Sequence, residues 1–429
     1  MIRIDSLDHE GRGVARVDGK VVFVDGGLPG ESVDLQIWKH HPKYDLANAT
    51  RILRASSLRV VPPCPHFDRC GGCSLQHLEP RAQVAMKQRV LEDNLARIGK
   101  VECETILSPI HGPAWGYRHR ARLSARYVAK KGGALVGFRE RRTHMVVDMN
   151  SCDVLPARIS ALIAPLRELV STLDLAARIP QIEIAVGDDA TVLTIRVLDA
   201  PEEGDLARLH RFAAERGVGI CLQTAGPDSI RAIDNEATPW LSYRLPEFDL
   251  ELRFLPSDFT QVNQAVNTVL VRRAVAMLAP ANGEIIADLF CGLGNFTLAL
   301  GRRGAQVYGV EGSKELVERA AQNASRNALA KRVKVFSADL LEHPLQALER
   351  LPKLDKMLID PPRAGAFALV QALGAEAPPR IVYVSCDPAT LARDAGVLVH
   401  NKGYRLQAAG VINMFPHTSH VESIAVFQR

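Results

Sequence analysis

The sequence predicts an α/β domain with a parallel sheet in the C-terminal part of the chain, preceded by a small all-β barrel and a mixed central domain. From about residue 256, strand patterns alternate with helical patterns, which is typical of strand–helix–strand crossovers. Near the N-terminus, short alternating segments are separated by glycine turns, as in small barrels. The 429 residues, 47% of them hydrophobic, suffice for two or three domains with real cores.

The barrel prediction covers residues 1–56. Segments 19–24 and 32–38 alternate apolar and polar residues, and glycine turns separate them, which favours a small OB-like barrel. Basic and aromatic residues gather in one predicted loop, which is either a solvated loop or an RNA contact. These residues are Lys39, His40, His41, Lys43 and Tyr44.

The predicted central domain, residues 57–255, begins with three cysteines that lie close together in sequence. They are Cys64, Cys70 and Cys73. Such short spacings favour metal ligation over three unrelated thiols. Cys152 is the best candidate for a fourth ligand, and Cys103 and Cys221 are alternatives. A zinc site and an iron–sulfur cluster both remain open, because each can use four thiolates.

Cysteine usage and the N-terminus indicate a reducing compartment. The first residues lack the apolar core of a signal peptide, and no run of about 18 apolar residues predicts a membrane span. We therefore expect a cytoplasmic, monomeric protein without a membrane partner, whose 8 cysteines bind metal or catalyse rather than form disulfides. The formal net charge of +5 does not by itself indicate a nucleic-acid partner.

The distribution of charge is more informative than its total. Between residues 115 and 145, many basic residues and several aromatic ones face a single acid, Glu140. Alternating arginines would share one face of a strand, and arginines among aromatic residues are typical of surfaces that bind phosphates and unpaired bases. We predict that this stripe contacts RNA; the alternative is that its arginines pair with acids elsewhere in the fold. The stripe consists of Arg118, Arg120, Arg122 and Arg126.

The predicted α/β domain, residues 256–429, has the most regular pattern. Helices are predicted at 314–327 and 389–400. In parallel sheets with helical crossovers, ligands bind at the carboxyl ends of the strands, so residues at these ends are site candidates. The predicted strands are 285–290, 306–310, 333–336, 356–359, 381–384 and 423–428.

A glycine-rich turn follows the first of these strands. Its backbone can approach a ligand closely, and the helix that begins behind it favours an anionic group. Thr297 stands where a dinucleotide-binding turn has its last glycine, so we expect a carboxylate ligand such as the methionine end of S-adenosylmethionine. At the ends of the following strands, Glu311 would bind ribose hydroxyls, Asp339 would lie near an adenine, and Asp360 supplies another acid.

Cys386 follows the strand 381–384, and Asp387-Pro388 then starts a helix. A thiol near a helix N-terminus has its thiolate favoured, as a nucleophile requires; the alternative is a small residue packed under a turn. Glu422 leads into the last strand and could act as a general base beside the other strand ends, although such an acid taken alone is more often a surface residue. Asp360 and Cys386 at successive strand ends indicate a catalytic edge.

Taken together, these motifs resemble the RNA 5-methyluridine methyltransferases. The resemblance spans the whole chain, and it is closest to members that carry an N-terminal TRAM β-barrel and a [4Fe-4S] cluster and that act on 23S ribosomal RNA. It implies a Rossmann-like class I methyltransferase domain, preceded by the TRAM barrel and a mixed iron–sulfur domain. The motifs are the cysteines Cys64, Cys70, Cys73 and Cys152, the segment 259–263, the turn 288–297, Asp360-Pro361-Pro362-Arg363, Ser385-Cys386-Asp387-Pro388 and His420-Val421-Glu422.

The resemblance also implies roles for individual residues. Cys386 would add to C6 of a uracil that has left its stack, and Glu422 would remove the C5 proton. The cluster would be structural, and a helix around 81–97 would pack on the catalytic domain. The residues assigned to the S-adenosylmethionine side are Gln261, Phe290, Asn295, Glu311, Asp339 and Asp360, of which the last could also touch the base.

Three other functions are alternatives. A non-catalytic iron–sulfur RNA-binding protein would not need both Cys386 and Glu422. A nucleobase N-methyltransferase would share the Asp-Pro-Pro run, but it would carry an aromatic residue in place of Arg363 and would need no cysteine. The third alternative is 5-methyluridine formation at another rRNA or tRNA uridine, because residues alone do not select the uridine.

Overall fold

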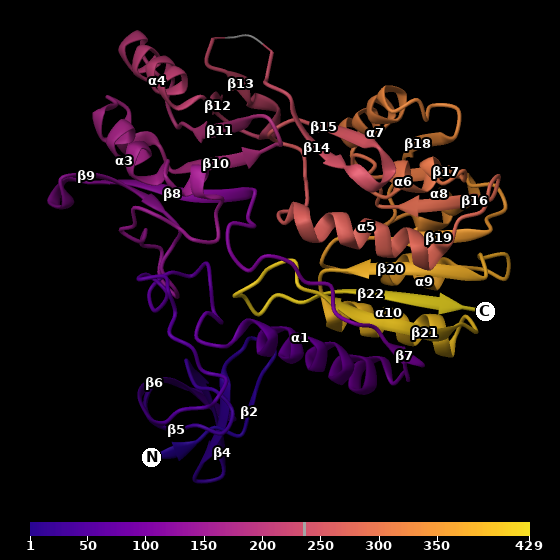
Figure 1. Ribbon diagram of the computed structural model, residues 1–429, viewed down its shortest axis with the longest axis horizontal. Coiled ribbons are helices and arrows are strands. Elements are labelled where there is room, and N and C mark those ends of the chain that lie inside the picture. Colours follow the sequence, from indigo (N-terminus) through magenta and orange to yellow (C-terminus); the bar gives the residue numbers. More distant parts are fainter. Residues whose placement is uncertain (235–236) are drawn as a thin grey trace.

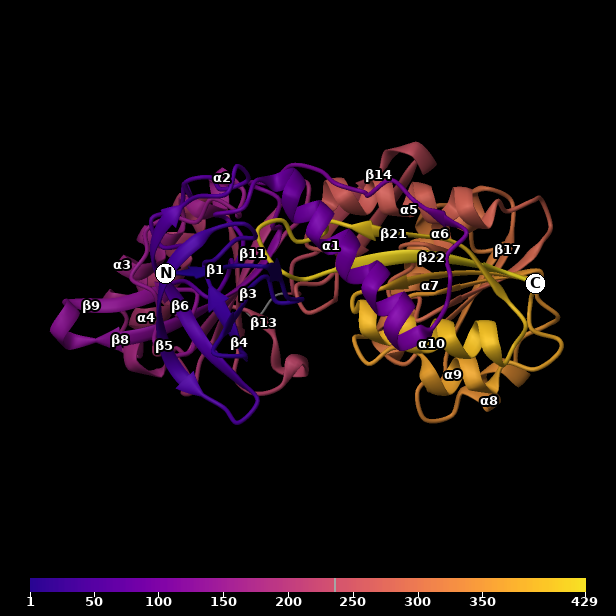
Figure 2. The ribbon, with the colours of Figure 1, turned by 90° about the horizontal axis from the view of Figure 1, so that it is seen from below.

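A computed structural model describes residues 1–234 and 237–429 of the chain. The barrel and the central domain lie at one end of the molecule and the α/β domain lies at the other (Figure 1). The helix α1 (Pro80–Asn94) runs along the α/β domain, as the view from below shows (Figure 2). No helix within the two described ranges is long and apolar enough to span a membrane.

The N-terminal strands form one sheet around a small apolar core. Alternate residues of a strand point to opposite faces, so β4 buries Val22 and Val24 while the residues between them stay partly exposed. This confirms the all-β prediction for the start of the chain. In spatial order the strands are β1 (Ile2–Arg3), β5 (Ser32–His40), β6 (Tyr44–Arg54), β4 (Lys20–Asp25), β3 (Gly13–Val17) and β2 (Ser6–Leu7).

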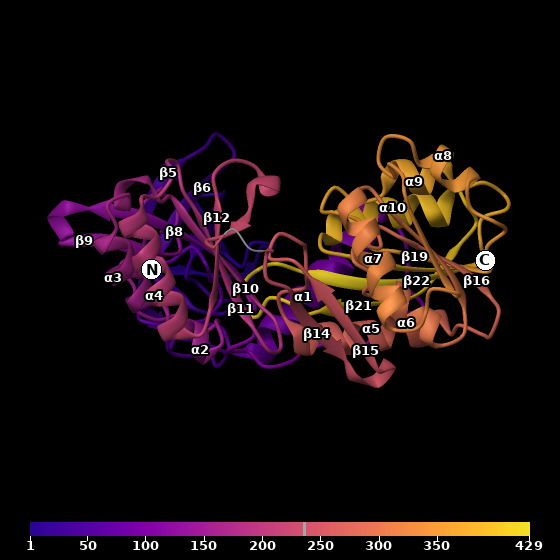
Figure 3. The same cartoon turned by 90° about the horizontal axis from the view of Figure 1, so that it is seen from above.

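The central domain is a second sheet covered by the helices α3 (Ile163–Thr172) and α4 (Glu203–Arg216). These helices lie on the side away from the α/β domain (Figure 3). Their apolar residues share a core with the sheet and with the predicted cysteine ligands. In spatial order the strands are β13 (Arg231–Ala232), β12 (Gly219–Gln223), β11 (Thr191–Arg196), β10 (Gln181–Val186), β8 (Arg120–Val128) and β9 (Gly133–Gly137).

The α/β domain is built on a sheet in which β16 to β20 are parallel and β22 is antiparallel to both of its neighbours. The strand order reverses beside β16, because β17 lies on one side of it and β19 on the other. The sequence predictions lacked β21 and the edge strand β7. In spatial order the strands are β18 (Val333–Ser337), β17 (Gln306–Glu311), β16 (Ile285–Leu289), β19 (Lys356–Ile359), β20 (Arg380–Ser385), β22 (Glu422–Gln428), β21 (Arg405–Ile412) and β7 (Thr105–Ile106).

Helices cover both faces of this sheet. Neighbouring residues of one strand face different layers, so Ile286 belongs to one apolar core and Ala287 to the other. The first layer comprises α5 (Gln264–Leu278), α6 (Thr297–Arg302) and α7 (Lys314–Arg326), and the second α8 (Pro344–Glu349), α9 (Phe367–Ala372) and α10 (Pro388–His400).

Segments from the sequence range of the central domain also pack on the α/β domain. Leu91 and Leu95 of α1 and the turn after it share the core of the second layer, which confirms the placement that the family resemblance implies. A Cβ on Gly99 would lie 2.4 Å from the Ala392 carbonyl oxygen, so only glycine permits this close approach to α10. The hairpin of β14 (Leu241–Leu245) and β15 (Leu250–Phe254) likewise shares the core of the first layer.

Candidate active site

The predicted nucleophile and the predicted base lie side by side at one edge of the sheet. Because β22 runs antiparallel to β20, it begins at the edge where β20 ends. Ser385 pairs with Ser423, and the residues adjacent to this pair are Cys386 and Glu422. The register of two strands therefore brings the thiol and the carboxyl together.

Cys386 lies between β20 and α10. Asp387 caps the helix, and its carboxylate accepts hydrogen bonds from the backbone N–H groups of Ala389 (2.9 Å) and Thr390 (3.3 Å). Burial and the nearby carboxylates, led by Glu422, raise the pKa of the Cys386 thiol to about 11. The expectation that the helix N-terminus favours the thiolate is therefore wrong for the resting protein, because burial and negative neighbours outweigh the helix.

The acids around the thiol also have raised pKa values. Glu422 is 6% exposed, and burial together with Asp360 raises its pKa to about 8. Burial and then Asp288 raise the pKa of Asp360 to about 8. His420 Nε2 lies 3.9 Å from a Glu422 carboxylate oxygen, and burial lowers the pKa of this histidine to about 4. Proton exchange near neutral pH is therefore available to the two acids.

The glycine-rich turn after β16 is held by a carboxylate and is open on one side. Glu311 holds the turn, since its carboxylate accepts hydrogen bonds from the N–H groups of Gly292 and Ser313, both at 3.0 Å. Phe290 has a φ of 65°, an uncommon conformation for a residue with a side chain. A Cβ on Gly292 would meet nothing within 4 Å, so this side of the turn is open to a ligand.

Asp288 offers a further signal of a ligand at this turn. It is 0% exposed, and one of its oxygens accepts a hydrogen bond from the Thr297 hydroxyl. Its other oxygen, Oδ1, has no hydrogen-bond partner within the described chain. Unpaired buried oxygens are costly, so a polar ligand at the turn fits this site. The sequence motif contained Asp288 without assigning it a role.

Asn295 and Asp339, two of the predicted cofactor residues, form hydrogen bonds within the protein. The Asn295 amide exchanges hydrogen bonds with the Asn267 amide (2.9 and 3.0 Å) and also accepts one from the Tyr243 hydroxyl (2.9 Å). Gln261 lines a small cavity beside Asn267 and Tyr243. Asp339 is exposed, and one of its oxygens accepts hydrogen bonds from the backbone after β18. Sequence reasoning missed Asn267 and Tyr243, because nothing local marks them as partners of Asn295.

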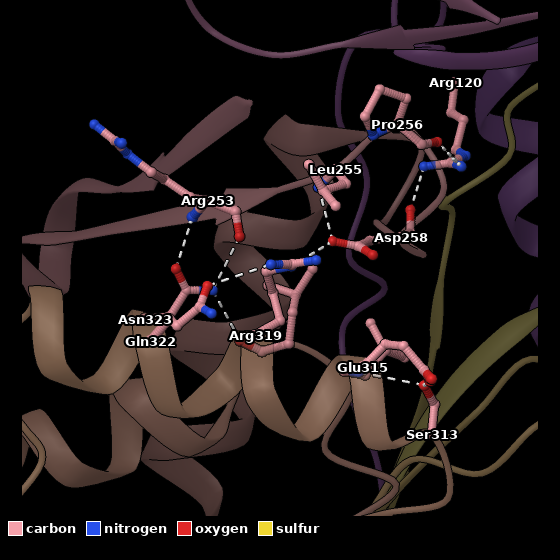
Figure 4. A network of polar contacts seen from close by, with 12 residues as sticks. Arg120, Arg253, Leu255, Pro256, Asp258, Ser313, Glu315, Arg319, Gln322 and Asn323 are labelled. Carbon is pink, nitrogen blue, oxygen red and sulfur yellow. Dashed lines mark hydrogen bonds and ion pairs between the residues drawn. The ribbon is translucent and has the colours of Figure 1, made fainter. Parts of the chain in front are cut away.

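The segment that leads to Gln261 is held by charged residues from two domains (Figure 4). Arg120 of β8 donates hydrogen bonds to the carbonyl oxygens of Pro256 and Asp258. Arg319 of α7 donates to the Asp258 carboxylate at 2.8 Å. Phe259, next in the chain, is left 68% exposed. The central domain and the α/β domain thus fix the base of this segment together.

The same contacts change the interpretation of the arginine stripe. Alternation is confirmed for Arg120, Arg122 and Arg126, which lie on the face of β8 opposite the buried residues, whereas Arg118 precedes this strand. The expectation that these arginines lack counter-charges is wrong for Arg122, which forms an ion pair of 2.9 Å with Glu183 of β10. Arg120 is engaged by backbone carbonyl oxygens instead of facing solvent. Glu183 is adjacent to Arg122 in the sheet but distant from it in the sequence, so sequence patterns did not reveal this ion pair.

The four predicted cysteine ligands converge in the core of the central domain. The Gly72 N–H points to Cys70 Sγ at 3.4 Å. Arg141 donates hydrogen bonds to the carbonyl oxygens of Cys70 and Cys73. Burial, with a contribution from neighbouring thiols, raises the pKa of Cys73 to about 11 and that of Cys152 to about 12.

The other two candidate ligands lie elsewhere. Cys103 donates a hydrogen bond to the Thr105 carbonyl oxygen beside β7, and Cys221 belongs to a different apolar core. Within residues 1–234 and 237–429, no three His, Cys, Asp or Glu side chains lie close enough together to hold a single metal ion.

Cys386 opens into a groove shared by all three parts of the molecule. The groove has a volume of about 1720 Å³. Its walls include Trp38 of the barrel, Arg139 of the central domain, and Arg89 and Arg97 at α1 and the turn that follows it. Basic and aromatic side chains thus surround the approach to the thiol.

Comparison with known proteins agrees with this site. The tRNA (Uracil-5-)-methyltransferase family matches residues 243–429, and the TRAM domain matches residues 1–49. The 23S rRNA (uracil(1939)-C(5))-methyltransferase RlmD of Azoarcus sp. (strain BH72) is 58% identical over 427 residues, covering 99% of each chain. The protein of the same name from Thiobacillus denitrificans is 57% identical over 430 residues, covering 100% of this chain and 99% of the relative.

A solved structure shows the same architecture over the full length. The Pyrococcus abyssi tRNA (uracil-54, C5)-methyltransferase in complex with S-adenosyl-L-homocysteine matches with a TM-score of 0.75 and 26% identity, covering 100% of both chains. Family, relatives and fold agree with one another. The chain therefore belongs to the RNA (uracil-C5)-methyltransferase family, in the branch of the 23S rRNA (uracil(1939)-C(5))-methyltransferases.

Proposed function

We propose that this protein methylates C5 of one uridine in 23S ribosomal RNA, with S-adenosylmethionine as methyl donor, in the cytoplasm. The observation that carries the proposal is the proximity of Cys386 and Glu422, which adjoin the paired residues Ser385 and Ser423, with Cys386 opening into the groove. The matching family is named for tRNA, but relatives above 50% identity over the whole chain are named for the rRNA uridine. Identity over the full length is more specific evidence for the RNA substrate than the match to the family, so we assign 23S rRNA.

In this reaction the thiol acts on one carbon of a double bond of the uracil and the carboxyl acts on the other. Cys386 Sγ bonds to C6 of the uracil, and the C5–C6 π electrons move toward C5, which becomes the nucleophile. S-adenosylmethionine supplies an electrophilic methyl group when bound. Glu422 then takes the C5 proton, the C–H electrons restore the C5–C6 double bond, and the Cys386–C6 bond breaks. The raised thiol pKa means that Cys386 must lose its proton as the substrate binds.

The residues around the turn after β16 would bind the methyl donor. Glu311 lies where an acid meets ribose hydroxyls, and Asp339 lies at the next strand end. Phe290 and Gln261 border the same region, and Asn295 would act through its neighbours because its amide is already engaged. Asp360 interacts electrostatically with both Cys386 and Glu422. It would reach the uracil as well as the methyl donor.

The function is tested by mapping 5-methyluridine in ribosomal RNA from a strain that lacks this gene. We expect one 5-methyluridine of 23S rRNA to disappear, at the position that corresponds to 1939 in the relatives' names. The native gene should restore it, and a gene with Cys386→Ala should not. Loss of a tRNA methylation with intact 23S rRNA would overturn the substrate assignment.

A [4Fe-4S] cluster held by four cysteines is the second part of the proposal. Three buried thiols and one half-buried thiol, all with raised pKa values, need a strong cationic partner before they can be thiolates. Around one zinc ion, sulfurs at about 2.3 Å would crowd together, whereas a cluster binds each thiolate to a separate iron. The resemblance of the cysteine motif to that of family members with a [4Fe-4S] cluster favours the cluster over zinc. The ligands would be Cys64, Cys70, Cys73 and Cys152.

Removing one ligand should decide the ligand set. Protein purified without oxygen should contain iron and absorb broadly in the visible range, and Cys152→Ala should lose most of this iron. Cys103→Ala is the control, because Cys103 lies beside β7, apart from the other ligands. Stoichiometric zinc without iron would overturn the cluster, and full iron content in Cys152→Ala would remove Cys152 from the ligand set.

The groove predicts which arginines bind RNA. Replacing Arg89 and Arg97 with alanine should weaken RNA binding and reduce the slope of log affinity against log salt by about 0.7 per charge. Both residues line the groove and are exposed. Arg122→Ala is the control, because Arg122 is similarly exposed and also pairs with an acid but does not line the groove. Binding titrations at several salt concentrations measure the slopes, and equal slopes in all three proteins would exclude the groove as the RNA path.

A further inference from the structure

The helix α1 presents two buried polar side chains to the loop that leads to Glu422. Gln83 and Lys87 are four residues apart, so they lie on one side of the helix. They are 1% and 0% exposed. A fully buried lysine is rare unless it is paired. The loop, residues 413–421, joins β21 to β22 and projects past the N-terminal end of α1 (Figure 1).

Gln83 and Lys87 both form hydrogen bonds with this loop. The Gln83 amide oxygen accepts from the His417 N–H at 2.8 Å, and its nitrogen lies 3.1 Å from His417 Nδ1. Lys87 Nζ donates to the Asn413 side-chain oxygen and to the Phe415 carbonyl oxygen, both at 2.8 Å. A loop held at both of these points has little freedom to move the residue that follows it.

Lys87 differs from Gln83 in carrying charge. Both of its hydrogen-bond acceptors are neutral, and the acid that interacts with it is Glu422. Burial lowers the pKa of Lys87 to about 7, against the opposing effect of Glu422, and Lys87 in turn lowers the pKa of Glu422. Each group therefore favours the charged form of the other.

Other titratable groups face this pair from the surrounding elements. Asp360 after β19 and Cys386 after β20 lie on the side of Glu422, and Asp360 opposes its ionisation. The two loop histidines have pKa values lowered to about 4 and are neutral near pH 7. The histidines are His417 and His420, and the charged neighbours of the latter are Lys87, Arg363 and Asp387. Lys87 is thus the cation that acts on Glu422 from inside the protein.

We propose that Lys87 is a positioning residue for the reaction, which fixes the loop before Glu422 through its two hydrogen bonds and places a cation where it favours the ionised Glu422 carboxylate that accepts the C5 proton. The inference rests on the proposed uridine methylation. In the step concerned, the proton passes from C5 to a Glu422 oxygen, the C–H electrons restore the double bond, and the bond from Cys386 to C6 breaks. Lys87 makes and breaks no covalent bond in this step.

The charge of Lys87 is tested by the pH dependence of adduct resolution. Lys87→Met keeps the length of the side chain and removes the ammonium group. Base catalysis requires ionised Glu422, so the rate rises with pH through the pKa of this residue, and a higher pKa moves the rise to higher pH. We expect the midpoint of this rise to move to higher pH in single-turnover reactions with a 23S rRNA fragment, measured from about pH 6 to about pH 10.

Gln83→Met is the matched control. It removes hydrogen bonds to the same loop from the same helix face but removes no charge, so it should slow the reaction without shifting its pH dependence. Asn413→Asp leaves Lys87 in place and adds a carboxylate beside its ammonium, so it should shift the rise in the same direction as Lys87→Met. If Lys87→Met fails to fold, as judged by circular dichroism, Asn413→Asp still tests the role of the Lys87 charge.

The outcomes separate this inference from the proposed function. An unshifted rise in folded Lys87→Met, or in Asn413→Asp when the first variant does not fold, overturns the role of the charge. An equal shift in Gln83→Met also overturns it, because loop position would then explain both effects. A native protein that forms neither product nor covalent adduct refutes the proposed function itself.

Discussion

Replacing Cys386 with alanine should reduce methylation of the RNA by at least about 10⁴-fold, as expected when an enzyme loses its nucleophile. Without the thiol, C5 of the uracil is not activated, and the remaining groups provide only binding. The variant should also form no covalent complex with RNA that contains 5-fluorouridine at the target position. Denaturing gels detect this complex, and radioactive methyl transfer measures turnover.

The binding of the methyl donor should survive this change. Cys386 lies after β20, whereas the turn after β16 and Glu311 would hold the donor. Calorimetry should therefore give an affinity for S-adenosylmethionine within a few-fold of the native value. Cys103→Ala serves as the control for the loss of a half-buried thiol and should keep full activity. Native turnover in Cys386→Ala would remove this residue from the mechanism.

Glu422→Gln should produce the opposite phenotype, an accumulation of covalent RNA–protein complex. The amide cannot accept the C5 proton, so methyl transfer proceeds but elimination of the thiolate slows by about 10²–10⁴-fold. In the native protein the elimination rate should rise with pH toward the Glu422 pKa of about 8, because only the ionised carboxyl accepts a proton. The glutamine variant should lose this rise.

A double variant provides the internal control. Glu422→Gln combined with Cys386→Ala should form no covalent complex, because the bond that traps the RNA requires the thiol. Rapid-quench experiments with labelled methyl donor and denaturing gels measure both the methylated RNA and the trapped fraction. Normal turnover of Glu422→Gln without a trapped species would assign the proton to another group, of which Asp360 is the nearest in charge and position.

The two variants probe different consequences of one strand pairing. Ser385 and Ser423 are opposite each other, and this register determines that thiol and carboxyl meet. A shift by one residue would turn one of the two side chains to the other face of the sheet. The apolar strands β20 and β22, buried along almost their whole length, fix this register.

The sequence by itself determined the elements and most of the chemistry-bearing residues. Strand and helix periods, glycine turns and short cysteine spacings are local patterns, so they predicted β16 to β20, the turn before Thr297 and the metal motif. The short strand β7 was not predicted, because two residues are too few to show an alternating pattern. Cys386 and Asp360 were recognisable because each follows a predicted strand, and Glu422 because it directly precedes one.

Only the tertiary structure decided how these residues act on one another. Lys87 and its partner Asn413 are 326 residues apart, and Arg122 and Glu183 are 61 apart, so no sequence window contains both members of either pair. The pKa of a side chain depends on burial and on charges within a few ångströms, whatever their position in the chain. For this reason the helix N-terminus predicted that the Cys386 thiolate is favoured, whereas burial and the surrounding carboxylates raise the pKa of this thiol.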